Sequence, residues 1–149
     1  MSAFRPARAD EAVAIVALWE ACGLTRPWNP PLADFARARG GAASDVLVGE
    51  DAGGLAATVM IGHEGHRAWV YYIAVREDAR RVGWGRAAMA AAEAWARERG
   101  MPKIMLMVRP DNLAVARFYE ALGYADDSIT TLSRWLDPEA EAARREAEA

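Results

Sequence analysis

Apolar residues in the first part of the chain recur at the spacing of a helix, after one short run that suits a strand. Residues 4–7 form that run, and Asp10 is then placed to cap a helix over residues 11–21. The segment 23–31 contains three prolines, which cannot continue a helix. We therefore expect a rigid loop there, followed by a short helix over residues 32–39.

Three strand-like runs follow in the middle of the chain. Residues 45–49, 55–62 and 68–75 contain mainly β-branched, aromatic and small apolar residues, and short turns that contain glycine separate them. This arrangement predicts an antiparallel meander.

Helix and strand patterns then alternate. Residues 85–99 are rich in alanine and stop at Gly100, as a helix does. Residues 103–108 are mostly apolar, which is typical of a strand buried on both faces.

A last helix and a last strand are predicted before a charged tail. The helix opens at Asp111 or Asn112 and runs to Leu122, and the strand covers residues 129–136. Residues 137–149 have helix propensity but no apolar stripe, so we expect a frayed helix or a disordered tail.

These elements together predict an α+β fold, of the mixed α/β kind, in one domain. Their order implies one mostly antiparallel mixed sheet of about six to seven strands, flanked by about four helices. A chain of 149 residues has room for one such domain, which we assign to residues 1–136.

Composition and charge exclude several classes of protein. The net charge of −3 comes from the tail, and the remaining residues carry equal numbers of acidic and basic side chains, which argues against a nucleic-acid surface. No run approaches the roughly 20 apolar residues of a membrane helix, so we expect a cytoplasmic protein that binds no membrane. The single cysteine, Cys22, cannot form an internal disulfide, and we expect it to be buried. No Cys/His spacing indicates a metal site.

The first chemical signal lies between the third middle strand and the long helix. There a strand leads into the run Arg80-Arg81-Val82-Gly83-Trp84-Gly85-Arg86. Free N–H groups at a helix N-terminus attract anions, and glycines let a phosphate approach the backbone. Two glycines alone fit a plain tight turn equally well. The run lacks the third glycine and acidic residue of a dinucleotide site and the Gly-Lys-Ser/Thr of a nucleoside-triphosphate site, so NAD and ATP fit poorly.

Two motifs together carry a family resemblance. Arg80-x-x-Gly83-x-Gly85 after a strand resembles the pyrophosphate-binding motif of the GNAT N-acetyltransferases, a superfamily of acyl-CoA-dependent enzymes. Residues 112–124 resemble that family's second motif, in which an asparagine is followed by a Phe-Tyr pair and a glycine. The resemblance covers nearly the whole chain and extends to the bacterial YpeA-type subgroup, which does not fix a substrate.

The resemblance implies a cosubstrate and the residues that bind it. Acetyl-CoA would lie against an open edge between two splayed strands, with no metal involved. The implied cofactor-binding residues are Ile73, Ala74, Val75, Arg80, Arg81, Val82, Gly83, Trp84, Gly85, Arg86, Asn112, Ala116 and Tyr119.

The resemblance also implies a catalytic residue. Tyr119 matches the family's usual general acid, which protonates the departing coenzyme A thiolate. Its helical spacing alone also fits a core aromatic beside Phe118. A backbone N–H of the strand that carries Ile73 is the implied oxyanion donor.

The general base and the acceptor site are less well defined. Some members of the family carry a glutamate on the strand after the long helix, but Met105-Leu106-Met107-Val108 offers no titratable group. The candidates for a base are Glu64, His63, His66, Tyr71 and Tyr72. The expected acceptor site combines Trp28 and Asn29 of the proline-rich loop with Glu64, Tyr71 and Tyr72, and Trp28 fits a cover of the core equally well.

We therefore expect an N-acyltransferase that moves an acetyl group from acetyl-CoA to a primary amine by direct attack in a ternary complex. The alternatives are an inactive acyl-CoA-binding sensor or interaction module, and an interaction domain in which the glycine loop is only structural. The acceptor, a small molecule or a peptide or protein amine, is not fixed by the sequence, because acceptor loops vary independently of the scaffold. Acyl-chain preference and a homodimer are left open.

Overall fold

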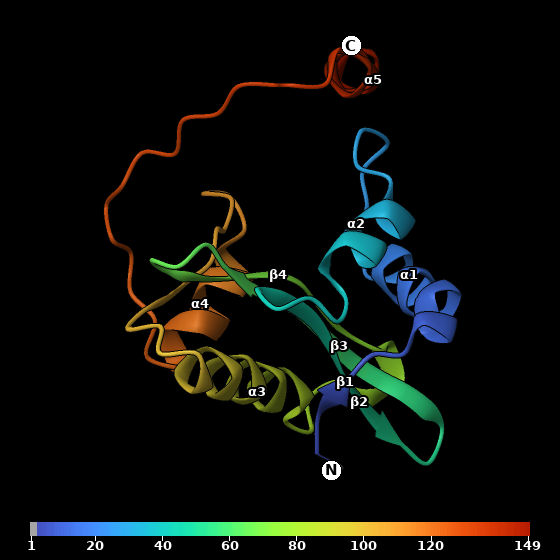
Figure 1. Ribbon diagram of the computed structural model, residues 1–149, viewed down its shortest axis with the longest axis vertical. Helices are drawn as coiled ribbons and strands as arrows, with labels where there is room; N and C mark the ends of the chain where they lie inside the picture. Colours follow the sequence, from blue (N-terminus) through green and yellow to red (C-terminus); the bar gives the residue numbers. More distant parts are fainter. Residues whose placement is uncertain (1–2) are drawn as a thin grey trace. The chain divides into compact units, whose positions relative to one another are not determined.

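The computed structural model of the protein describes residues 3–149 (Figure 1). Their backbone forms two compact units, residues 3–106 and 107–149. The first unit is built on a sheet of five strands in the order β1-β2-β3-β4-β5. Their bounds are Arg5–Pro6 (β1), Ser44–Asp51 (β2), Gly54–His63 (β3), Ala68–Val75 (β4) and Ile104–Met105 (β5). The predicted meander is confirmed, because β2, β3 and β4 pair antiparallel with their neighbours in sequence.

Three α-helices cover the two faces of this sheet. Helices α1 (Ala12–Ala21) and α2 (Pro31–Ala38) pack on one face and α3 (Trp84–Glu98) on the other (Figure 1). Two short 3₁₀ turns, η1 (Ala9–Glu11) and η2 (Glu77–Ala79), precede α1 and α3. The core beneath α1 and α2 contains the buried side chains of Ile15, Leu18, Trp19, Phe35, Val46 and Val48.

The predicted cap of the first helix is wrong. Asp10 lies inside η1, where its carboxylate accepts a bond from Nε of Arg8 at 3.3 Å. The residue at the N-cap of α1 is Glu11, which makes no side-chain capping bond there. The acidic pair at 10 and 11 is used for ion pairs with arginines, because those are the stronger charge-assisted partners within reach.

The N-terminus of α3 is fixed by packing against the sheet. The Trp84 side chain is buried and lies edge-on to Phe4, with ring centroids 5.9 Å apart. A Cβ atom added at Gly49 of β2 would lie 2.5 Å from Cζ3 of Trp84. Glycine at this position therefore lets the indole close against β2, and the indole sets where α3 begins.

The strand predicted over residues 103–108 is correct only in part. β5 consists of Ile104–Met105, which pair in parallel with Ala68 and Trp69 of β4. Both β5 residues are half-buried and Met107 is 54% exposed, so the run is not buried on both faces. Because β5 is the last strand of the sheet in the described residues, it is supported on one side only.

The second unit contains two helices, α4 (Leu113–Ala121) and α5 (Pro138–Glu148). The strand predicted over residues 129–136 is wrong, because this segment has no regular secondary structure and pairs with no strand within residues 3–149. Ile129 and Leu132 are 66% and 89% exposed. A run of residues with strand propensity does not make a strand without a paired edge, which the run itself cannot supply.

The charged tail is a surface helix. The Asp137 side chain accepts a bond from the N–H of Glu139 and so caps α5, which carries two i,i+4 ion pairs, Arg144–Glu148 and Arg145–Glu141. No residue of α5, all of which are described, is buried. The tail is thus a capped helix in the structure, and its assignment to a region outside a domain of residues 1–136 stays a prediction.

The predicted fold class is confirmed, with small differences in the counts. Residues 3–149 contain five strands rather than six to seven and five α-helices rather than about four. Among these residues, no helix is both long enough and apolar enough to cross a bilayer.

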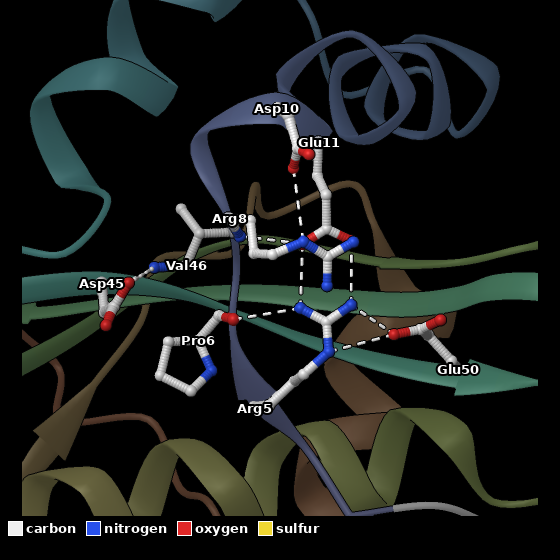
Figure 2. A network of polar contacts seen from close by, with 8 residues as sticks. All are labelled: Arg5, Pro6, Arg8, Asp10, Glu11, Asp45, Val46 and Glu50. Atoms are coloured by element: carbon white, nitrogen blue, oxygen red, sulfur yellow. Dashed lines mark hydrogen bonds and ion pairs between the residues drawn. The ribbon is translucent and has the colours of Figure 1, made fainter.

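An arginine at the first strand links three elements by charge (Figure 2). The Arg5 guanidinium donates to both carboxylate oxygens of Glu11, at 2.8 and 2.9 Å, and also bonds Glu50 of β2. The N–H of Arg8 donates to Glu11 as well, at 2.8 Å. The bonds from Arg5 are the main cause that lowers the pKa of Glu11 from 4.5 to about 2.

This shift predicts how stability depends on pH. Since the pKa of Glu11 is lower in the folded than in the unfolded chain, its contribution is complete above about pH 4.5 and is lost as the pH falls towards 2. The Glu11→Gln variant should therefore lose less stability than the wild type over this interval, as measured by urea unfolding at several pH values. Asp10→Asn, at an exposed neighbour, serves as the control. Equal pH dependence in wild type and Glu11→Gln would contradict the assignment.

Candidate active site

Strand β4 carries a bulge in its middle. Met60 of β3 lies opposite Tyr71, and Thr58 lies opposite Ala74, so the single residue Val59 faces two residues of β4, Tyr72 and Ile73. Tyr72 has φ +49°, which is rare for a residue with a side chain. Bulges re-aim side chains, and this one directs both Tyr71 and Tyr72 to the same cavity.

Contacts with α1 and β3 hold Tyr72 in its strained backbone conformation. The Trp19 indole stacks on the Tyr72 ring, with centroids 4.0 Å apart and planes 10° from parallel. The indole N–H of Trp19 donates to Oγ1 of Thr58 at 3.0 Å, and that hydroxyl donates to the carbonyl of Tyr72 at 3.3 Å. Trp19 and Thr58 are completely buried, so these polar groups have no water to replace a lost partner. Together they offset the roughly 1–3 kcal/mol that such a backbone conformation costs.

The Tyr72 hydroxyl points to helix α2. It donates to Oδ2 of Asp34 at 2.8 Å, while Oδ1 of Asp34 accepts a bond from Arg37 at 2.5 Å. Burial of the phenol, followed by the neighbouring Asp34 carboxylate, raises the pKa of Tyr72 well above its ordinary value. Tyr72 is therefore a neutral hydrogen-bond donor at physiological pH and not a base.

Two adjoining cavities lie beside this bulge. The larger has a volume of about 580 Å³ and the smaller about 300 Å³. They share four lining residues, Ala38, Ser44, Met60 and Tyr71. Tyr72, Asp34 and Asn29 line the larger cavity alone, whereas Trp69, His63 and Glu64 line the smaller alone. We call the two together the β4 groove.

Of the predicted acceptor residues, four line the β4 groove. Asn29 and Tyr72 lie at one end, Glu64 at the other and Tyr71 along both cavities. Trp28 is half-buried and lines neither cavity, which favours its alternative role as a cover for neighbouring residues. Asp34 and Arg37 were missed, because an i,i+3 acid and base on a helix give the same sequence signal as an ordinary solvated pair.

The candidate bases at the β3–β4 turn are tied to the backbone. Oε1 of Glu64 accepts the N–H groups of Arg67 and His66, at 2.6 and 3.1 Å, and the bond from Arg67 is the main cause that lowers the pKa of Glu64. Nδ1 of His63 accepts the N–H of Gly65 at 3.0 Å. Burial, and then the charge of Glu64, raise the pKa of Tyr71. Glu64 is thus a carboxylate and Tyr71 a neutral phenol at physiological pH.

Among residues 3–149, the far end of β4 has no partner strand on the side of β5. β4 pairs with β5 only through Ala68 and Trp69, and the strand then continues to Val75. Among the predicted cofactor residues there, Ile73 is half-buried and the Ala74 side chain is buried in the core. The Val75 carbonyl already accepts bonds from Nε of Arg80, at 3.2 Å, and from Sγ of Cys22, at 3.4 Å.

The glycine loop turns the chain sharply from β4 into α3. Arg81 and Gly83 have φ values of +68° and +98°, and Gly83 is the N-cap of α3 without a side-chain capping bond. The first intrahelical bond runs from the N–H of Ala87 to the Gly83 carbonyl. The N–H groups of Trp84, Gly85 and Arg86 thus precede the hydrogen-bonded part of the helix.

The side chains of the glycine loop differ in whether they are free to face a ligand. Arg81, Val82 and Arg86 are exposed, and the two arginines form no ion pair with any residue in the described part of the chain. The Trp84 side chain is buried, so only its main chain can face a ligand. Arg80 bonds Val75 and lies 3.6 Å from Sγ of Cys22, which makes it a tie between the loop and α1. Cys22 itself is half-buried rather than fully buried.

The second unit holds the other predicted site residues. Oδ1 of Asn112 accepts the N–H of Val115 at 3.4 Å, so Asn112, and not Asp111, is the cap of α4. Ala116 is half-buried. The Tyr119 side chain is 6% exposed, and its ring meets those of Phe118 and Tyr124 edge-on, at 5.0 and 5.8 Å. Burial raises the pKa of Tyr119 to about 12.

Comparison with known proteins gives consistent matches. Residues 13–124 match the model of the family described as "Acetyltransferase (GNAT) family". An acetyltransferase of Pectobacterium atrosepticum is 41% identical over 129 residues, which cover 87% of this chain and 92% of that protein. An acetyltransferase of Sodalis glossinidius is also 41% identical, over 130 residues that cover 87% of this chain and 92% of that protein.

Solved structures share the fold at lower identity. The aminoglycoside N-acetyltransferase AAC(6')-Iy, solved with a bisubstrate analogue, superposes with a TM-score of 0.76 at 16% identity, covering 89% of this chain and 96% of that one. Glucosamine-6-phosphate N-acetyltransferase of Arabidopsis thaliana gives a TM-score of 0.69 at 19% identity, covering 90% and 97%. Among residues 3–149, no group of three or more His, Cys, Asp or Glu side chains is placed to hold a metal ion.

The two hydrogen bonds of the Thr58 hydroxyl predict how an isosteric substitution of this residue changes stability. Thr58→Val keeps the side-chain shape but leaves the Trp19 N–H and the Tyr72 carbonyl without this partner, so it should lower the free energy of unfolding by roughly 1–3 kcal/mol. Thr58→Ser retains the hydroxyl and is the matched control, and urea unfolding measures both. If Thr58→Val were as stable as Thr58→Ser, the hydroxyl would not support the bulge.

Proposed function

Since this chain belongs to the GNAT acetyltransferase family, we propose that it transfers an acetyl group from acetyl-CoA to a primary amine by direct attack in a ternary complex. The observation that carries the proposal is the far end of β4, whose edge is unpaired on the β5 side within residues 3–149. The chain leaves it through η2 and the glycine loop to the N-terminus of α3, which has no side-chain cap. An extended amide-containing arm fits the edge, and a pyrophosphate fits the helix terminus.

The residues of the glycine loop suit an anionic ligand. Gly83 has no Cβ and takes the left-handed conformation, and the backbone N–H groups of Gly85 and Arg86 follow it. The exposed guanidinium groups of Arg81 and Arg86 add positive charge. The Ile73 and Val75 backbone would face the arm, although the carbonyl of Val75 is already bonded to Arg80.

The β4 groove is the acceptor site in this proposal. It lies next to the bulge at Tyr72 and Ile73, the point where a backbone N–H can face the thioester oxygen. The amine nitrogen attacks the thioester carbon, the carbon–sulfur bond breaks, and the sulfur leaves with its electron pair. The nitrogen loses one proton to solvent or to a base, and the sulfur gains one.

Tyr119 is the proposed donor of that last proton. Its place in the second family motif supports the role, and a pKa of about 12 keeps the phenol protonated at physiological pH. The unused proton is available because the Tyr119 hydroxyl donates to no acceptor within residues 3–149. An inactive acyl-CoA-binding module would share the loop but would not turn over, so turnover separates the two.

The glycine loop predicts a binding defect. Acetyl-CoA at about 100 times its dissociation constant should stabilise the wild type by about 2.7 kcal/mol and raise its melting temperature. Gly83→Glu should abolish this shift, because the carboxylate would occupy the place of an anionic pyrophosphate. Gly100→Glu, at the other end of α3, is the control, since Gly100 also has positive φ and has no atom within 4 Å of an added Cβ. A full ligand shift in Gly83→Glu would move the phosphate site elsewhere.

Tyr119 predicts a catalytic defect. Tyr119→Phe removes one oxygen and keeps the ring contacts, so kcat should fall by about 100-fold, the lower end of the range for acid–base groups, because a thiol is a moderately good leaving group. Acetyl-CoA affinity should barely change, and the loss should shrink with acyl donors whose thiols are more acidic. Tyr124→Phe, in the same aromatic cluster, is the control. Turnover near that of the wild type in Tyr119→Phe would assign the proton to water or another hydroxyl.

A further inference from the structure

The β4 groove is elongated along one strand. The smaller cavity lies at the start of β4, against Trp69 and the β3–β4 turn, and the larger lies at the bulge, against Tyr72. At about 3.3 Å per residue, these two positions on β4 are roughly 10 Å apart. Tyr71 and Met60 line both cavities and give the connecting part an aromatic and aliphatic wall.

The two ends of the groove differ in charge. At the bulge, the Asp34 carboxylate is already paired with Arg37 and bonded by Tyr72. At the turn, Glu64 is the one acidic residue that lines the smaller cavity. A ligand that spans the groove therefore meets a carboxylate paired with an arginine at one end and, at the other, a carboxylate that accepts its hydrogen bonds from backbone N–H groups.

The Glu64 carboxylate has capacity for a ligand. Both of its hydrogen bonds fall on Oε1, so within the part of the chain that the structure describes Oε2 accepts none. The two backbone donors also fix the orientation of the carboxylate. The guanidinium of the neighbouring Arg67 is turned to the carbonyl of His66, at 3.0 Å, rather than to Glu64.

We propose that the acceptor is a small aliphatic diamine, with one nitrogen reacting beside the bulge and the second, protonated nitrogen held by Glu64. This inference rests on the proposed acetyl transfer. The reacting nitrogen must be uncharged, which suits the end where Asp34 is already neutralised by Arg37. The distant nitrogen keeps its proton and forms a charge-assisted hydrogen bond with Oε2 of Glu64. The methylene chain between them lies against Met60 and Tyr71.

The test compares amines that differ only in the second nitrogen. Release of the coenzyme A thiol is measured with straight-chain diamines from diaminopropane to diaminooctane, and with monoamines of the same carbon numbers. We expect an optimum of chain length among the diamines and a KM at least about tenfold below that of the matched monoamine. Glu64→Gln should raise the diamine KM to that of the matched monoamine, because the second nitrogen then loses its charged partner.

The control and a second readout keep the outcomes apart. Glu146→Gln makes the same change at an exposed glutamate of α5 and should leave the diamine preference intact. Equal KM values for diamines and monoamines in the wild type, or equal losses for both in Glu64→Gln, would overturn the inference. Absence of thiol release with every amine would refute the proposed function instead. Calorimetric titration then measures the dissociation constant of the best diamine for the wild type and for Glu64→Gln. Equal dissociation constants would also overturn the inference.

Discussion

The stacking of Trp19 on Tyr72 is the contact on which the rest of the first unit depends. It joins α1 to the bulge of β4, and the same indole donates to Thr58, which in turn donates to the Tyr72 carbonyl. A tryptophan at the centre of the core therefore sets the backbone of the strand that forms the groove. Core packing and site geometry are therefore linked. Trp19, the largest of the fully buried side chains, also holds Tyr72 in its strained conformation.

The bulge has two consequences for β4. It places the consecutive residues Tyr71 and Tyr72 at one cavity, although neighbours on a regular strand point to opposite faces. It also lies where β4 has already left β5. The strand is thus regular where it supports the sheet and irregular where a substrate would meet it, which is where strain concentrates in proteins.

Sequence periodicity predicted the parts of the fold that local packing decides. Residues 68–75 and 85–99 carry their own pattern, and β4 and α3 form there. The bulge could not be predicted, because the φ of Tyr72 is imposed by Trp19 and Thr58, which are distant in sequence. For the same reason the sequence indicated Tyr71, Tyr72 and Glu64 but not Asp34, whose place in the groove depends on how α2 packs. The strand predicted over residues 129–136 is wrong because strand propensity favours an extended segment without providing the partner strand that it needs.

The close contact between Gly49 and Trp84 limits how this protein can diverge. No side chain larger than hydrogen fits at position 49 while the indole remains, since even a methyl carbon would lie 2.5 Å from it. A smaller residue at position 84 would in turn leave a void beneath the first turn of α3. The two sites are therefore expected to mutate together or not at all. Natural variation at one should be statistically correlated with variation at the other, although two whole strands, β3 and β4, separate them along the chain.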